Sequence, residues 1–137
     1  MIISVDFDGT IVNGDNYPEI GNIQPFAAAV VREWKKDGHT IIFNSCRTGR
    51  YEGMAVDFLI EHDIPFDYFN CNHPKQIELY KMDCRKISAD IYIDDKQLGG
   101  LPESWIEINH IVKDHPKYYD NEENRSKNSS GFNEQAG

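Results

Sequence analysis

Apolar residues recur along the chain in two alternating patterns: short runs rich in β-branched side chains, and longer stretches with helical spacing. The runs predict strands at 2–5, 40–44, 65–70 and 89–93. The spaced stretches predict helices at about 25–37, 51–62 and 74–83, and a fourth that begins at Pro102. In this last helix we expect Trp105, Ile108, Ile111 and Val112 to face inward. Alternating strands and helices predict an α/β three-layer sandwich with a mainly parallel sheet.

The apolar pattern fades after residue 113. Residues 114–137 hold only Tyr118, Tyr119, Phe132 and Ala136 as apolar side chains, too few to offset the entropy lost on ordering the segment. We therefore expect one domain at 1–113, followed by a mostly disordered polar tail at 114–137. Between the first strand and the first helix, residues 11–24 are rich in Gly, Asn and Pro, which predicts a loop or a small hairpin.

Acidic side chains follow two of the predicted strands. Asp6 and Asp8 stand at the end of the first strand, where alternation along an extended chain puts them on the same side. Asp94 and Asp95 follow the fourth strand. Since the carboxyl ends of parallel strands meet at one edge of a sheet, the four acids would converge there and repel one another. A divalent cation would remove that repulsion, and a set of oxygen ligands favours Mg²⁺.

Phosphate-binding groups are expected at the same edge. Ser45 ends the second strand with a hydroxyl and a backbone N–H that we expect to be free to hold a phosphate oxygen. Lys86 precedes the fourth strand and could bring an ammonium to the same anion. Lys75 and Lys81 lie in the same connection, so the choice of lysine stays open.

The turn after the second strand offers further candidates. Cys46 and Arg47 are possible substrate contacts, while Arg47 and Arg50 could equally form structural ion pairs. No CxxxxxR loop follows Cys46, which argues against a cysteine phosphatase. The five histidines lack the spacing of a metal site.

Taken in order, the four motifs resemble those of the haloacid dehalogenase (HAD) superfamily. Its phosphatases carry DxDGT after the first strand, Ser or Thr after the second, then a Lys, and an acidic pair after the fourth. The matching positions here are Asp6-Phe7-Asp8-Gly9-Thr10, Ser45, Lys86 and Asp94-Asp95. The resemblance spans about residues 1–113. The SCR turn and the stretch KISADIYIDDK are similar to small capless members such as uncharacterised Bacteroides hydrolases.

The resemblance implies a Rossmann-like sheet of strand order 3-2-1-4 and a two-step phosphoryl transfer. Asp6 would attack phosphorus and form an aspartyl-phosphate, while Asp8 would act as general acid and then as general base. Mg²⁺ would be held by Asp6, the backbone carbonyl of Asp8 and Asp94, with Asp95 binding directly or through water. Thr10 would either join the phosphate cradle or brace the loop.

The resemblance also bears on the reaction and its substrate. The intervals from Asp8 to Ser45 and from Ser45 to Lys86 are each filled by a helix and its connections, so we expect no cap domain. An acid at position 8 favours a phosphomonoester hydrolase over dehalogenases, phosphonatases and P-type ATPases. A phosphotransferase and a non-catalytic module that binds phospho-ligands or a partner remain alternatives. The substrate would be a phosphorylated small molecule or a phosphorylated macromolecular end.

Charge and composition limit the partners. The chain has 14 Lys and Arg against 23 Asp and Glu, a net charge of −9, which argues against a broad nucleic-acid-binding face and against adsorption to anionic membranes. Three cysteines without a CxxC pair fit a reducing compartment. No export signal or membrane span is expected, so we predict a cytoplasmic protein and leave its oligomeric state open.

Overall fold

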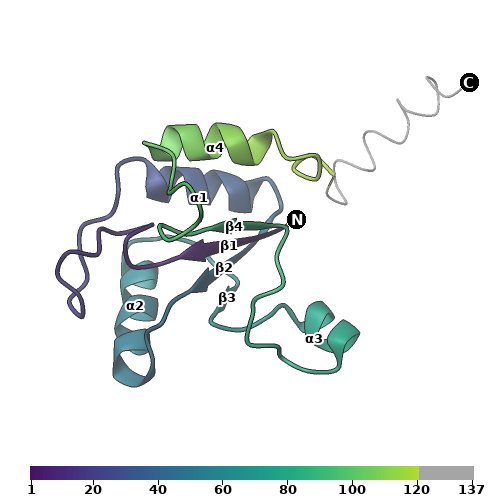
Figure 1. Ribbon diagram of the computed structural model, residues 1–137, viewed down its shortest axis with the longest axis horizontal. Coiled ribbons are helices and arrows are strands. Elements are labelled where there is room, and N and C mark those ends of the chain that lie inside the picture. The colour runs from purple at the N-terminus through teal and green to yellow at the C-terminus, as the bar shows by residue number, and fades with distance from the viewer. Residues whose placement is uncertain (121–137) are drawn as a thin grey trace, which may run out of the picture.

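Strands and helices alternate along the chain in the computed structural model, which describes residues 1–120 (Figure 1). In chain order the elements are β1 (Ile2–Asp6), α1 (Ala27–Lys36), β2 (Thr40–Asn44), α2 (Gly49–Glu61), β3 (Tyr68–Phe69), α3 (Pro74–Tyr80), β4 (Ile91–Ile93) and α4 (Trp105–Lys113). The predicted order of elements is confirmed.

The four strands form one parallel sheet in the order β3-β2-β1-β4, which confirms the predicted topology. In register, Ile3 of β1 lies opposite Ile41 of β2 and Ile91 of β4. Because the strands run in the same direction, the residues that follow β1, β2 and β4 emerge at one edge of the sheet. At this edge Asp6 lies opposite Asn44, the residue that directly precedes Ser45.

Helices cover both faces of the sheet (Figure 1). On one face α1 and α4 pack together, and the rings of Trp34 and Trp105 lie 5.8 Å apart. On the other face α2 brings Phe58 edge-on to Phe7, with ring centroids 6.1 Å apart. None of the residues of α3 is buried, and this helix stands away from the sheet. The three layers therefore rest mainly on α1, α2 and α4.

Residues 11–24 fold back on themselves as a small hairpin. The Asn13 amide donates to the Asn22 carbonyl at 2.9 Å, and the Gln24 amide donates to the Ile11 carbonyl at 2.9 Å. Within residues 1–120, no further domain is inserted between β1 and β4. As expected, the described chain has no cap.

Two strands are shorter than predicted because an aspartate takes over the pairing at their beginning. The carboxylate of Asp67 accepts from the Ile41 amide at 2.8 Å, and that of Asp90 accepts from the Ile2 amide at 2.8 Å. A side-chain oxygen thus replaces the backbone carbonyl that would have continued the ladder, and β3 and β4 begin only after these residues.

Helix α4 departs from the prediction at its start and on one face. It begins at Trp105 rather than Pro102, because the Ser104 hydroxyl accepts from the Glu107 amide at 3.2 Å and caps the helix. Ile111 is 56% exposed, so the expectation that it faces inward is wrong. The buried positions Trp105, Ile108 and Val112 define a narrower apolar stripe.

The packed domain extends beyond the predicted end at residue 113. Tyr118 is only 1% exposed, and its hydroxyl donates to the Asp37 carboxylate at 2.6 Å. The rest of the predicted tail, 121–137, lies outside the described residues. Among the helices of residues 1–120, none combines the length and the apolar character needed to cross a membrane.

Candidate functional site

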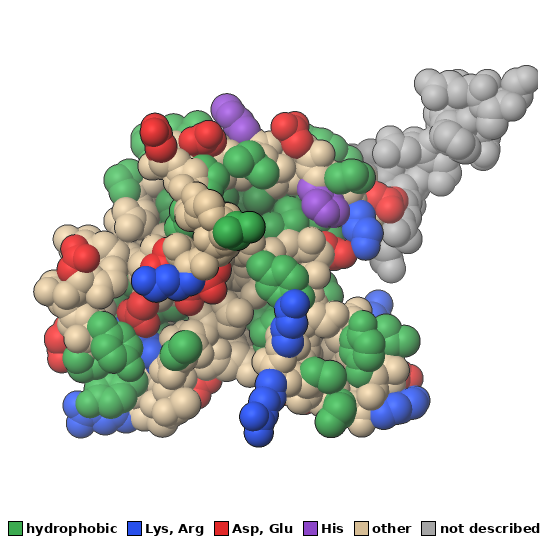
Figure 2. Space-filling model, viewed as in Figure 1, with side chains coloured by type: hydrophobic (Ala, Val, Ile, Leu, Met, Phe, Trp, Pro, Cys, Tyr) green, Lys and Arg blue, Asp and Glu red, His purple; other side chains and the backbone are tan. Residues whose placement is uncertain are grey.

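Three carboxylates meet at the edge of the sheet where β1 and β4 end. Asp6 is the last residue of β1, and Asp94 and Asp95 follow β4 directly. One oxygen from each of the three side chains lies within 4.8 Å of the other two. Figure 2 shows acidic side chains gathered in a hollow on this side of the molecule. The predicted convergence is therefore confirmed for these three acids.

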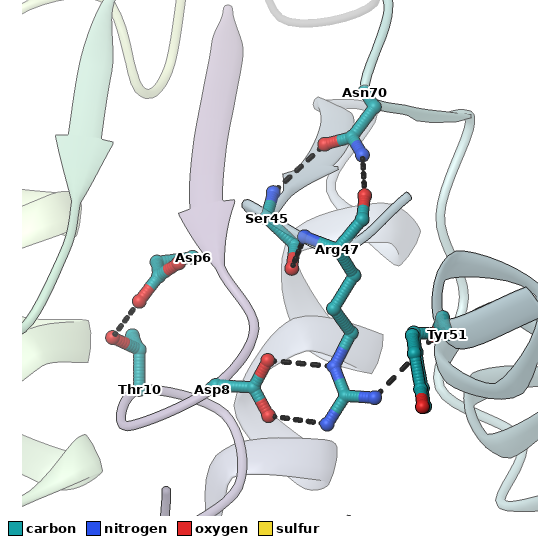
Figure 3. A network of polar contacts seen from close by, with 7 residues as sticks. All are labelled: Asp6, Asp8, Thr10, Ser45, Arg47, Tyr51 and Asn70. Atoms are coloured by element: carbon teal, nitrogen blue, oxygen red, sulfur yellow. Dashed lines mark hydrogen bonds and ion pairs between the residues drawn. The ribbon is translucent and has the colours of Figure 1, made fainter. Parts of the chain in front are cut away.

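Thr10 holds the two loops of this cluster together. Its hydroxyl donates to the Asp6 carboxylate at 3.1 Å (Figure 3) and accepts from the Asp95 amide at 3.1 Å. The Thr10 side chain is buried, so of the two predicted roles the structure supports the brace. Gly9 is required beside it, because its φ is +84° and a Cβ atom would lie 2.4 Å from Oδ2 of Asp95.

Burial and neighbouring acids raise the pKa of Asp6 to about 7. Desolvation is the largest cause, followed by a hydrogen bond with the Asp95 carboxyl and by the charge of Asp94. Such crowding of acids is relieved when a cation binds between them. The donor set of three carboxylates, with no nitrogen or sulfur ligand, fits a hard ion such as Mg²⁺. The backbone carbonyl of Asp8 as a further ligand stays a prediction.

Asp8 is bound to Arg47 rather than to this acidic cluster. Arg47 donates from Nε to Oδ2 of Asp8 at 2.7 Å and from Nη2 to Oδ1 at 2.8 Å, a bidentate ion pair (Figure 3). The Arg47 side chain is fully buried, and its guanidinium lies 5.6 Å from the Phe7 ring and 5.0 Å from the Tyr17 ring. Asp8 is the main cause of the raised pKa of Arg47. Of the two roles predicted for Arg47, the structure shows the internal ion pair.

Ser45 differs from its prediction in one respect. Its backbone N–H is not free, because it donates to Oδ1 of Asn70 at 2.7 Å (Figure 3). The Ser45 oxygen accepts from the Arg47 amide at 2.9 Å, which leaves the hydroxyl proton to be donated. Asn70 directly follows β3 with φ of 56°, a left-handed conformation that asparagine tolerates well. Asn70 could have been noticed in the sequence, because it is a polar residue at the end of a predicted strand.

A cavity of about 380 Å³ opens at this edge of the sheet. The predicted residues that line it are Asp6, Ser45, Cys46, Lys86 and Asp94. Lys75 and Lys81 are not among its lining residues, so of the three candidate lysines Lys86 is the one that lines the cavity. Asp8, Thr10, Arg47 and Asp95 lie outside the lining as well.

The lining includes residues that sequence reasoning missed, among them Asn70, Arg85 and Tyr92. The Lys86 ammonium lies 5.2 Å from the centre of the Tyr92 ring. The Tyr92 hydroxyl donates to the Ile87 carbonyl at 2.6 Å and fixes the backbone beside Lys86. Arg85 could have been noticed as a second cation next to Lys86, whereas no sequence pattern distinguishes Tyr92.

Comparison with known proteins places the chain beside one solved structure. No profile of a known protein family matches the chain, and no curated protein does. A chain of the Pnkp1/Rnl/Hen1 RNA repair complex is 20% identical over 69% of this chain and 36% of that one, with a TM-score of 0.48, and we draw nothing from it. A conserved protein from Bacteroides thetaiotaomicron is 34% identical over 82% of this chain and 89% of its own, with a TM-score of 0.73. The chain therefore belongs to the same family as this conserved Bacteroides protein.

Proposed function

We propose that the protein is a Mg²⁺-dependent phosphomonoester hydrolase of the HAD type. One observation carries the proposal: Asp6 lies within reach of Asp94 and Asp95 at a cavity that also exposes the Ser45 hydroxyl and Lys86. A carboxylate nucleophile beside a cation site and opposite a phosphate-binding ammonium is what phosphoryl transfer through an aspartyl-phosphate requires.

In the proposed first step an oxygen of Asp6 forms a bond to phosphorus, and the bond from phosphorus to the leaving oxygen breaks. Asp8 gives its proton to that leaving oxygen. In the second step a water oxygen attacks phosphorus, Asp8 takes the water's proton, and the Asp6 carboxylate is released with inorganic phosphate. Lys86 and the Ser45 hydroxyl hold the phosphoryl oxygens in both steps.

The ion pair with Arg47 sets a condition on this mechanism. Both oxygens of Asp8 accept hydrogen bonds from Arg47, so in this conformation the Asp8 carboxyl group is not placed to donate to a leaving group. Acting as the acid of the first step requires Asp8 to turn from Arg47 toward the cavity. Arg47 is then a positioning residue, which holds Asp8 between turnovers.

The residues that would hold Mg²⁺ are Asp6 and Asp94, with Asp95 direct or through water and the Asp8 carbonyl as a further ligand. When bound, the ion would neutralise the acidic cluster and the charge of the phosphoryl group. Loss of Asp94 should then weaken Mg²⁺ binding. We expect Asp94→Asn to reduce the rise in melting temperature caused by Mg²⁺, whereas Asp57→Asn, an exposed carboxylate on α2, should leave that rise unchanged.

The deciding experiment measures Mg²⁺-dependent release of phosphate from an aryl phosphate and from a panel of phosphomonoesters. We expect turnover by the wild-type protein and a loss of at least about 10³-fold in Asp6→Asn, which lacks the nucleophile. Wild-type rates no higher than those of Asp6→Asn on every substrate would overturn the proposal. Phosphate passed to an added alcohol rather than to water would indicate a phosphotransferase.

One observation favours the alternative of a non-catalytic module that binds phosphorylated ligands. Asp8 is tied to Arg47 and does not line the cavity, whereas Asp6, Ser45 and Lys86 do. If the protein only binds phosphate, Asp8→Asn should leave affinity for inorganic phosphate unchanged, and neither the wild type nor the variant should turn over the aryl phosphate. If it is a hydrolase, Asp8→Asn should abolish turnover of the aryl phosphate.

A further inference from the structure

The segment between α3 and β4 brings two adjacent cations to the cavity that holds Asp6. Arg85 and Lys86 both line this cavity, and both side chains are exposed. Figure 2 shows Lys and Arg side chains standing out along this segment. The proposed function gives Lys86 a role, whereas it gives none to Arg85.

The segment is held in place by Asn72, whose side chain is buried. Its Nδ2 donates to the Asp83 carboxylate at 2.9 Å and to the Cys84 carbonyl at 2.9 Å, while its Oδ1 accepts from the Ser88 amide at 2.6 Å. The Tyr92 hydroxyl holds the residues that follow Lys86, because it accepts a hydrogen bond from the Ala89 amide at 3.1 Å. The backbone that carries Arg85 and Lys86 is therefore fixed on both sides.

Arg85 has no anionic partner in the described part of the chain. The four ion pairs of residues 1–120 involve Lys35, Arg47, Lys113 and Lys117. Other exposed cations such as Arg50 and Lys81 also lack an ion pair among these residues, but unlike Arg85 they do not line the cavity. The guanidinium offers a planar fork of donors that matches a carboxylate or phosphate group.

We propose that Arg85 binds a second anionic group of the substrate, so that the site selects small phosphomonoesters that also carry a phosphate or a carboxylate. The inference rests on the proposed function, in which Lys86 holds the reacting phosphoryl group. Since the two cations are neighbours on one fixed segment, a substrate with two anionic groups engages both at once. The cavity, about 380 Å³, has the size of a small-molecule site, which favours a metabolite over a macromolecular end.

The first test compares substrates in matched pairs. Fructose 1,6-bisphosphate is set against fructose 6-phosphate, and 3-phosphoglycerate against glycerol 3-phosphate, with a 3′-phosphorylated oligonucleotide as a further substrate. We expect kcat/KM to be at least about tenfold higher for the substrate with the second anion, and Arg85→Gln to reduce this ratio about tenfold. Lys81→Gln, an exposed cation outside the cavity, should leave the ratio unchanged. An unchanged ratio in Arg85→Gln, or a preference for the oligonucleotide, would overturn the inference.

A binding measurement separates this inference from the proposed hydrolase activity. In the Asp6→Asn background with Mg²⁺ present, calorimetry measures the affinities for fructose 1,6-bisphosphate and for inorganic phosphate. We expect Arg85→Gln to weaken bisphosphate binding about tenfold relative to phosphate binding, and more so at low ionic strength. If the wild type shows no turnover but this difference persists, the hydrolase proposal fails and the role of Arg85 stands. Turnover of phosphomonoesters without this difference in affinity would refute the role of Arg85 and leave the hydrolase proposal standing.

Discussion

Arg47 and Asp8 form the buried ion pair on which the loops after β1 and β2 depend. The Arg47 side chain is fully buried and that of Asp8 is 20% exposed, so neither charge is well hydrated when the other is removed. Arg47 also donates to the Tyr51 carbonyl at 3.4 Å, which connects the pair to the first turn of α2. This single side chain therefore links three parts of the site (Figure 3).

Removing the guanidinium alone should destabilise the protein more than removing both charged partners together. We expect Arg47→Met to lower the free energy of unfolding by about 2–3 kcal/mol, because Asp8 stays charged without a partner. Adding Asp8→Asn should restore part of that loss. Arg50→Met, at an exposed position in the first turn of α2, should change the free energy by less than about 0.5 kcal/mol. Urea denaturation measures these four proteins and the single variant Asp8→Asn, and strictly additive losses in the double variant would contradict the coupling.

Gly9 offers a second test at a single position. In Gly9→Ala the new Cβ meets Asp95 at 2.4 Å in a backbone with φ of +84°, so both strain and a displaced carboxylate follow. We expect a loss of about 1–3 kcal/mol of stability and a smaller rise in melting temperature with Mg²⁺.

The matched control is Gly53→Ala, since a Cβ at this position of α2 meets nothing within 4 Å. Alanine in a helix interior should raise the stability by about 0.5–1 kcal/mol and leave the response to Mg²⁺ unchanged. A full Mg²⁺ response in Gly9→Ala would show that Asp95 does not depend on this close approach.

At the scale of elements, α3 is the helix whose stability is easiest to improve. Its C-cap residue, Lys81, has φ of 63°, a left-handed conformation that favours glycine. We expect Lys81→Gly to stabilise the protein by about 0.5–1 kcal/mol without loss of activity, because Lys81 does not line the cavity. Lys75→Gly, within the same helix, should destabilise it by a similar amount. Thermal unfolding compares the two, and a destabilised Lys81→Gly would show that this lysine has another contact.

The order of elements could be predicted because each strand is a short apolar run and each helix has a periodic apolar face. The ends of the elements depended on contacts distant in sequence. Asp67 and Asp90 shorten β3 and β4 by binding amides of neighbouring strands, and Tyr118 extends the domain by reaching Asp37 at the C-terminal end of α1. A periodic pattern contains no information about such partners.

The same distinction holds for the site. Asp6 and Asp94 could be placed because parallel strands bring their carboxyl ends to one edge. The partners of Ser45 and Asp8 could not, because Asn70 lies 25 positions from Ser45 and Arg47 lies 39 from Asp8, in loops whose paths the strands do not determine. Sequence reasoning therefore located Asp6, Asp94 and Asp95 and gave an ion pair as one role of Arg47. It missed Asn70 and did not identify Asp8 as the partner of Arg47.

At the scale of the whole molecule, His39 lies where the beginning and the end of the described domain meet. It is fully buried, with Nδ1 at 3.0 Å from the Met1 amino group and its ring 4.3 Å from that of Tyr118. Within residues 1–120, its Nε2 has no hydrogen-bond partner. Burial, assisted by the positive charge of the amino group, lowers the pKa of His39 to about 4.

This pKa predicts how the stability of the domain depends on pH. His39 is neutral in the folded protein but takes up a proton below about pH 6.5 once unfolded, so its contribution to stability is complete above that pH and is lost as pH falls toward 4. Asp6 acts in the opposite direction in the metal-free protein, because its raised pKa favours the folded state at low pH and that contribution disappears as pH rises through about 7. The two effects partly cancel in the wild type.

The effect of His39 should therefore be measured in the Asp6→Asn background, where the opposing titration is absent. Between pH 7 and pH 5 we expect this protein to lose about 1–2 kcal/mol of unfolding free energy that the additional change His39→Gln retains. His110→Gln, at an exposed position on α4, should leave the pH dependence unchanged. Urea denaturation at the two pH values provides the comparison. Equal losses with and without His39 would mean that His39 is hydrated or paired in the folded protein, and that its burial does not make the junction between the beginning and the end of the described domain sensitive to acid.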